Sequence, residues 1–83
     1  LCIHGIQSHA GWYDLSCRHL SQQGMDVFFV DRRGSGMNTE DRGFCTGFGQ
    51  LRDDLRRAVA HVRAMSPSRK VFLVAISWGA KLA

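Results

Sequence analysis

The stretch VFLVAISWGA, residues 71–80, decides how this chain is expected to fold. Six apolar residues run directly into Ser77, and Gly79 with further helix-forming residues follows. One interpretation is that Ser77 caps a helix that begins there. The other is that Ser77 lies on a tight turn between a buried strand and a helix, where small residues such as Ala75 and Gly79 let the two elements approach closely. On such a turn the hydroxyl group is exposed, beside the unpaired N–H groups of the helix.

Upstream of this stretch, strand patterns alternate with helix patterns. Residues 1–3 are typical of the end of a buried strand, and residues 12–23 carry apolar side chains at helical spacing before Gly24. Residues 27–30 are strand formers with apolar character on both faces. A long amphipathic helix is predicted next, ending at residues 66–68. Its apolar positions are Phe48, Leu51, Leu55, Val59, Val62 and Met65.

The third strand is expected over residues 71–76, buried like the first two, with a helix after Ser77. The order strand, helix, strand, helix, strand, helix implies parallel strands joined by right-handed crossovers. We therefore predict an α/β fold with three layers, α/β/α. Because the chain opens within an apolar stretch and stops within a helical pattern, we expect residues 1–83 to be part of a single domain that is truncated at both ends.

Composition narrows the class of protein. The 83 residues carry a formal net charge of +4, largely from arginines, and 45% of them are hydrophobic, as is ordinary for an α/β segment. Four arginines lie on the expected long helix, and we interpret them as its solvated side. We expect no nucleic-acid partner, because no aromatic residues that could stack on bases alternate with these arginines. Three cysteines without C-x-x-C spacing predict reduced thiols and a cytoplasmic location. No cofactor or metal is expected, and no apolar run is long enough to cross a bilayer.

Three loops are expected to meet at one edge of the sheet, since function in parallel sheets gathers outside the carboxyl ends of the strands. They are residues 4–6, residues 31–36 within a long loop over 31–45, and residues 75–79. The geometry expected at Ser77 suits attack on a carbonyl group. The backbone N–H groups of Ile6 and Trp78 would then form a two-donor oxyanion hole. Alternatively, residues 4–6 form an ordinary strand-end turn in which backbone hydrogen bonds satisfy His4.

These three stretches resemble the α/β-hydrolase superfamily, and most closely its serine hydrolases of the monoacylglycerol lipase and lysophospholipase type. HGIQSHAGWY matches the family's HG-x-x-x-H-x-G-x-Y segment, DRRGSG its D-x-x-G-x-G turn, and AISWGAKLA its G-x-S-x-G nucleophile elbow. Ala75 replaces the first glycine of the elbow, and Ala80 replaces a further frequent glycine. The likeness covers essentially the whole chain.

The resemblance implies a role for each matching residue. Ser77 is the nucleophile, and the N–H groups of Ile6 and Trp78 form the oxyanion hole. The substrate-binding residues are His4, Gly5 and His9, with His9 in the loop that lines the acyl-side approach. Asp31, Arg33, Gly34 and Gly36 shape the neighbouring loop. The implied activity is hydrolysis of a lipid-like or small acyl ester, a small-molecule substrate, through an acyl-enzyme.

The family's acid and base follow the elbow in chain order. Four histidines precede the elbow, namely His4, His9, His19 and His61, and we assign none of them as the base. We therefore expect the 83 residues alone to be inactive. Three alternatives stay open: a ligand-binding protein without turnover on the same fold, an acyltransferase, thioesterase or peptidase with the same site, and nucleotide binding at residues 34–36. The last lacks a third glycine at position 39, and a long irregular loop, not a helix, is expected to follow.

Overall fold

The computed structural model describes residues 1–83, with a three-stranded parallel sheet at its centre. The strands are β1 (Cys2–Ile3), β2 (Phe29–Val30) and β3 (Val74–Ala75), in the order β2-β1-β3. Cys2 pairs with Phe29 on one side and with Val74 on the other. The first strand of the chain therefore lies in the middle of the sheet. This arrangement confirms the predicted parallel α/β fold.

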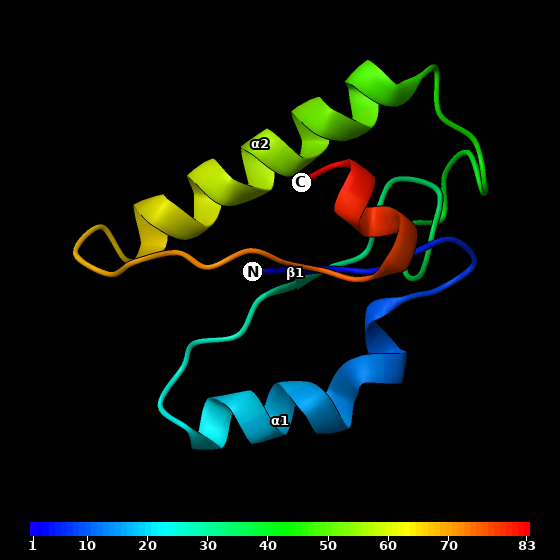
Figure 1. Cartoon of the computed structure of the whole chain (residues 1–83). Coiled ribbons are helices and arrows are strands. Elements are labelled where there is room, and N and C mark those ends of the chain that lie inside the picture. Colours follow the sequence, from blue (N-terminus) through cyan, green and yellow to red (C-terminus); the bar gives the residue numbers. More distant parts are fainter.

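Helices cover both faces of the sheet (Figure 1). A 3₁₀ helix, η1 (Ala10–Tyr13), leads into α1 (Asp14–Gln22) on one face, and α2 (Phe48–Met65) crosses the other. A second 3₁₀ helix, η2 (Ser77–Lys81), follows β3 directly. The bounds of α2 agree with the apolar periodicity of the sequence. The helix predicted over residues 12–23 is present as η1 followed by α1.

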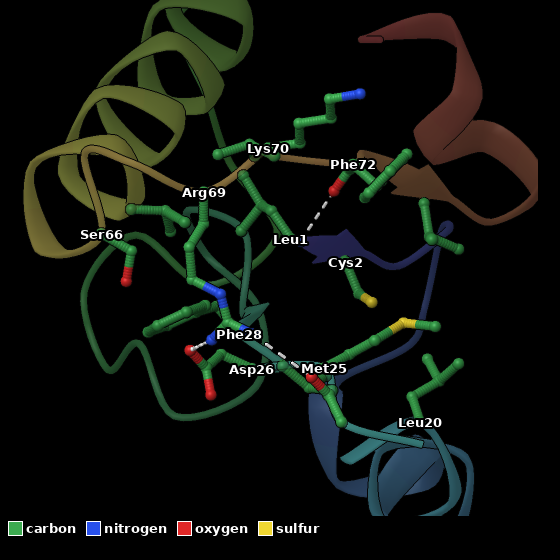
Figure 2. A pocket seen from close by; sticks show the side chains of 15 residues that line it. Leu1, Cys2, Leu20, Met25, Asp26, Phe28, Ser66, Arg69, Lys70 and Phe72 are labelled. Atoms are coloured by element: carbon green, nitrogen blue, oxygen red, sulfur yellow. Dashed lines mark hydrogen bonds and ion pairs between the residues drawn. The ribbon is translucent and has the colours of Figure 1, made fainter. Parts of the chain in front are cut away.

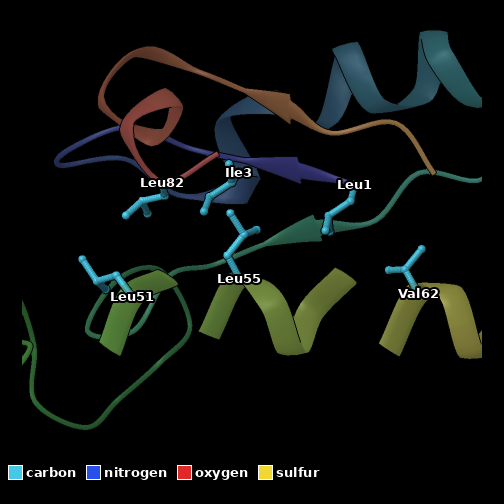
Figure 3. Close-up of a cluster of buried hydrophobic side chains, with 6 residues drawn as sticks. All are labelled: Leu1, Ile3, Leu51, Leu55, Val62 and Leu82. Atoms are coloured by element: carbon cyan, nitrogen blue, oxygen red, sulfur yellow. The ribbon is translucent and has the colours of Figure 1, made fainter. Parts of the chain in front are cut away.

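The core lies between α2 and the sheet (Figure 3). The side chains of α2 that recur at helical spacing point toward the sheet, where the apolar residues of β1 and of η2's end meet them. The buried cluster consists of Leu1, Ile3, Leu51, Leu55, Val62 and Leu82. Removing each such leucine from water contributes about 1.5–3 kcal/mol, which makes this interface the main source of stability.

The face of the sheet toward α1 is less well packed. A cavity of about 360 Å³ opens between the end of α1 and the start of the strands (Figure 2). Phe72 and Val74 line it and are 71% and 45% exposed. The prediction of a buried strand over residues 71–76 is therefore wrong in part. The strand contains Val74–Ala75 alone, and Phe72, Leu73 and Val74 are exposed in a segment that forms the edge of the sheet.

The remaining features are local. The three cysteines are free, with Cys2 buried and the other two half-buried. Residues 31–45 form no helix or strand, in agreement with the loop predicted there. None of the helices combines the length and the apolar character needed to cross a membrane.

Candidate active site

Ser77 lies where β3 turns into η2, and its side chain is exposed. Its φ angle of 54° falls in the left-handed region, which costs an L-residue about 1–2 kcal/mol. Ile76 occupies the position before the helix, and η2 begins without a side-chain cap. Of the two interpretations of Ser77, the geometry therefore favours the exposed turn over the helix cap.

The turn at Ser77 packs tightly against the end of β1. A Cβ atom added to Gly79 would lie 2.6 Å from the carbonyl oxygen of His4, so only glycine fits at this approach. A Cβ atom added to Gly5 would lie 3.1 Å from the Ser77 Cβ and 3.4 Å from its Oγ. The loop after β1 and the turn after β3 are therefore in direct contact, as expected for neighbouring parallel strands.

The two backbone groups predicted as oxyanion donors flank this contact. Ile6 directly follows Gly5 and lies outside every helix and strand, and its N–H donates to no backbone carbonyl. Trp78 occupies the first turn of η2, where N–H groups have no partner within the helix. Neither N–H group thus has a backbone acceptor, and each belongs to the residue that follows one side of the contact between Gly5 and Ser77.

The imidazole of His4 is fully buried beneath this edge of the sheet. Its Nδ1 lies 2.8 Å from the Gly5 carbonyl oxygen, and its Nε2 accepts a hydrogen bond of 3.1 Å from the Arg32 N–H. Because Nε2 accepts from a backbone N–H and Nδ1 faces a carbonyl oxygen, the geometry fits a neutral ring with its proton on Nδ1. Burial acts in the same direction, since it lowers the pKa of His4. The nearby Asp31 carboxylate, 3.9 Å from Nε2, is then not an ion-pair partner. The structure places His4 under the predicted substrate-binding surface rather than on it.

His9 lies in the loop between β1 and η1. Its Nδ1 accepts a hydrogen bond of 3.1 Å from the Gly11 N–H, and its ring packs against Trp12 with the ring centres 5.0 Å apart. His9 and Ile6 both line a wide depression between this loop and residues 31–45. Neither Ser77 nor Trp78 is part of its lining.

The turn after β2 is organised around the carboxylate of Asp31. Its two oxygens accept hydrogen bonds from the backbone N–H groups of Ala10, at 2.7 Å, and Met37, at 3.0 Å. Burial by itself raises the pKa of Asp31, but the two donors outweigh it and lower the pKa. Gly36 has a φ of 58°, and an added Cβ there would overlap this carboxylate. Asp31 thus ties the loops after β1 and β2 together.

Sequence reasoning assigned no role to Arg32, which the structure places at the centre of the site. Its guanidinium donates to the carbonyl oxygen of Gly5 and lies over the indole of Trp78, 5.2 Å from the ring centre. Burial lowers its pKa. The sequence DRRGSG does not indicate which of its two arginines turns inward. In the structure Arg32 does so, while Arg33 pairs with Asp54 at the surface.

His, Cys, Asp and Glu side chains form no group of three that could hold a metal ion. The cavity of Figure 2 lies at the end of the sheet where the strands begin, and none of the predicted site residues lines it. The predicted site residues therefore gather at the opposite, carboxyl end of the strands.

Comparison with known proteins gives two matches. The family model described as "Serine aminopeptidase, S33" matches residues 1–83. A protein named "Monoglyceride lipase homolog", from Monkeypox virus, is 30% identical over 79 residues. That alignment covers 95% of this chain and 29% of the viral protein, so the chain spans less than a third of the relative's length. No solved structure gives a significant match.

The family match covers every loop described above, and the parallel sheet is the one that this family implies. The chain belongs to the serine aminopeptidase S33 family of α/β-hydrolases.

Proposed function

We propose that these residues supply the nucleophile and the oxyanion hole of a serine hydrolase that cleaves lipid-like or small acyl esters. The observation that carries the proposal is the close approach of Gly5 to Ser77. If Gly5 carried a Cβ atom, that atom would lie 3.1 Å from the Cβ atom of Ser77. It joins the turn of the exposed Ser77, whose backbone is left-handed, to the loop that contains Ile6. That combination is the apparatus of acyl transfer.

In the proposed reaction, Ser77 Oγ attacks the ester carbonyl carbon while a base removes the hydroxyl proton. The carbonyl oxygen becomes an oxyanion and accepts hydrogen bonds from the N–H groups of Ile6 and Trp78. The intermediate collapses, the alcohol leaves with a proton, and the acyl group stays on Ser77. Water then attacks the acyl-enzyme by the same steps and releases the acid.

The base and its supporting acid come, in this proposal, from residues outside 1–83. No histidine here is hydrogen-bonded to Ser77: His4 is buried with both ring nitrogens engaged, and His9 accepts the Gly11 N–H. His19 and His61 are exposed on α1 and α2. The aligned part is 29% of the viral relative, so most of that protein lies outside the alignment.

A peptidase is the second candidate, because the family description names an aminopeptidase. An aminopeptidase needs an anionic group to hold the substrate's ammonium group. Asp31 is poorly suited to this task, because it is half-buried and already binds two backbone N–H groups. The name of the viral relative also favours an ester. We therefore rank ester hydrolysis above peptide hydrolysis.

Turnover of two substrate types by the full-length protein tests this proposal. We expect hydrolysis of a monoacylglycerol, little hydrolysis of an aminoacyl p-nitroanilide, and a loss on the order of 10⁶-fold in kcat for Ser77→Ala. Ser16→Ala, at an exposed position of α1, is the matched control and should keep full activity. Preference for the anilide would support the peptidase instead. Turnover by Ser77→Ala within tenfold of the unchanged protein would refute both.

A further inference from the structure

We infer that Arg32 is a positioning residue that orients and polarises the peptide group whose N–H binds the oxyanion. This inference rests on the proposed function, because it concerns the same oxyanion hole. It assigns a task to a side chain that touches both halves of that hole, the peptide preceding Ile6 and the ring of Trp78.

The argument starts from the peptide between Gly5 and Ile6. All peptide bonds of the chain are trans, so the C=O of Gly5 and the N–H of Ile6 belong to one planar unit and point in opposite directions. Whatever holds the Gly5 oxygen therefore fixes the direction of the Ile6 N–H.

Two donors converge on the Gly5 oxygen. One is the protonated Nδ1 of buried His4, at 2.8 Å, and the other is the guanidinium of Arg32. A carbonyl oxygen has two lone pairs, so this oxygen is fully engaged and the peptide cannot rotate without breaking both bonds. His4 is itself held by the Arg32 backbone N–H, at 3.1 Å on Nε2. Arg32 thus acts on the Gly5 oxygen directly and also through His4.

Charge adds to orientation. A hydrogen bond from a cation to a carbonyl oxygen withdraws electron density from the peptide, and such chains strengthen the N–H at the far end as a donor. The Ile6 N–H is that far end. The guanidinium therefore strengthens the Ile6 donor without occupying the space where the substrate's oxygen would bind.

The place of the guanidinium is fixed by Trp78. It lies over the indole, 5.2 Å from the ring centre, and the indole in turn meets Phe48 of α2 edge-on. The Arg32 Nε is buried and has no hydrogen-bond partner, so the guanidinium is held by its contacts with the Gly5 oxygen and the Trp78 ring. It connects the loop after β1 to the turn after β3.

Kinetics of Arg32→Met and Arg32→Lys in the full-length protein test the inference. Misaligning one donor should cost somewhat less than its complete loss, so we expect kcat of Arg32→Met to fall about 10- to 100-fold with KM within about twofold. Inhibition by a trifluoromethyl ketone, which forms a tetrahedral oxyanion on serine, should weaken by the same factor. Arg32→Lys keeps the charge and one donor and should recover part of the loss.

Arg18→Met is the matched control, since it loses an exposed pair with Asp14 on α1 but no contact with Gly5 or Trp78. It should keep kcat and the inhibitor's affinity. If Arg32→Met keeps both within about twofold, or if it lowers thermal stability and activity no more than Arg18→Met does, the inference is overturned.

If the proposed function is wrong, the protein without substitutions will show no reaction at Ser77. A crystal structure of Arg32→Met then tests whether Arg32 positions the Gly5–Ile6 peptide. A rotated or doubly populated Gly5–Ile6 peptide supports the positioning role. An unchanged, singly populated peptide refutes it.

Discussion

At the scale of single residues, the site depends on a few side chains in unusual environments. Ser77 has a left-handed backbone with φ of 54°, and His4 is a buried, neutral imidazole. Neither arrangement is favourable on its own. The first costs backbone strain, and the second is stable only while both ring nitrogens keep their hydrogen-bond partners.

The strain at Ser77 predicts that glycine stabilises this position. Ser77→Gly should unfold with a free energy about 1 kcal/mol larger than Ser77→Ala, because glycine adopts a positive φ without a Cβ penalty. Chemical denaturation of the two inactive variants measures the difference. Equal stability would mean that the left-handed backbone at Ser77 is absent in solution.

The buried His4 predicts a loss of stability at mildly acidic pH. Its pKa is lowered below the usual 6.5 in the folded protein, so between those two values the unfolded chain binds more protons. Stability is therefore full above pH 6.5 and falls as the pH drops below it, by at most about 1.4 kcal/mol per pH unit.

Denaturation at a series of pH values from 7.5 to 5 measures this slope. His4→Asn, which cannot titrate, is the control and should show less of it. Asp31 does not confuse the result, because its lowered pKa makes its contribution disappear only below the usual 3.8. A flat profile for the unchanged protein would contradict a buried neutral His4.

At the scale of elements, α2 packs on the sheet, and the positions of the strands determine where the site loops begin. Three of its side chains, Leu51, Leu55 and Val62, are buried against β1 and η2's end. The ends of the helix are less buried, with Phe48 44% and Met65 55% exposed. Because β1 lies between β2 and β3, any shift of α2 against β1 would move the loops on which Gly5 and Ser77 lie.

Leu55→Ala tests the contribution of α2. Leu55 is buried in the middle of the cluster, so its truncation should cost about 2–5 kcal/mol of unfolding free energy. Arg56→Ala, one position further along, removes only an exposed pair with Asp53 and should cost less than about 1 kcal/mol. Thermal or urea denaturation distinguishes the two. Similar costs for both variants would mean that α2 does not pack on the sheet as described.

At the scale of the whole molecule, patterns of period and spacing predicted the architecture. The apolar spacing located α2, and the serine after an apolar run located the turn between β3 and η2. Both features are local, so the sequence carries them directly. The parallel direction of the strands was predicted from the alternation of elements. Their order, β2-β1-β3, was not predicted.

What the sequence did not reveal depends on contacts between distant residues. The strands contain only two residues each, and Phe72 and Val74 are exposed at the edge of the sheet. Whether an edge strand is covered depends on packing that no local pattern encodes. The inward turn of Arg32 toward Gly5 and Trp78 joins three loops, and the burial of His4 beneath them is likewise tertiary.

The central claim is that Ser77 is the nucleophile, and covalent labelling tests it most directly. Treatment of the full-length protein with a fluorophosphonate, followed by tryptic digestion, would release residues 71–81, in which Ser77 is the one serine. The account predicts a single adduct, on that peptide, that is absent from Ser77→Ala. An unmodified peptide 71–81, or equal labelling of Ser77→Ala, would contradict it.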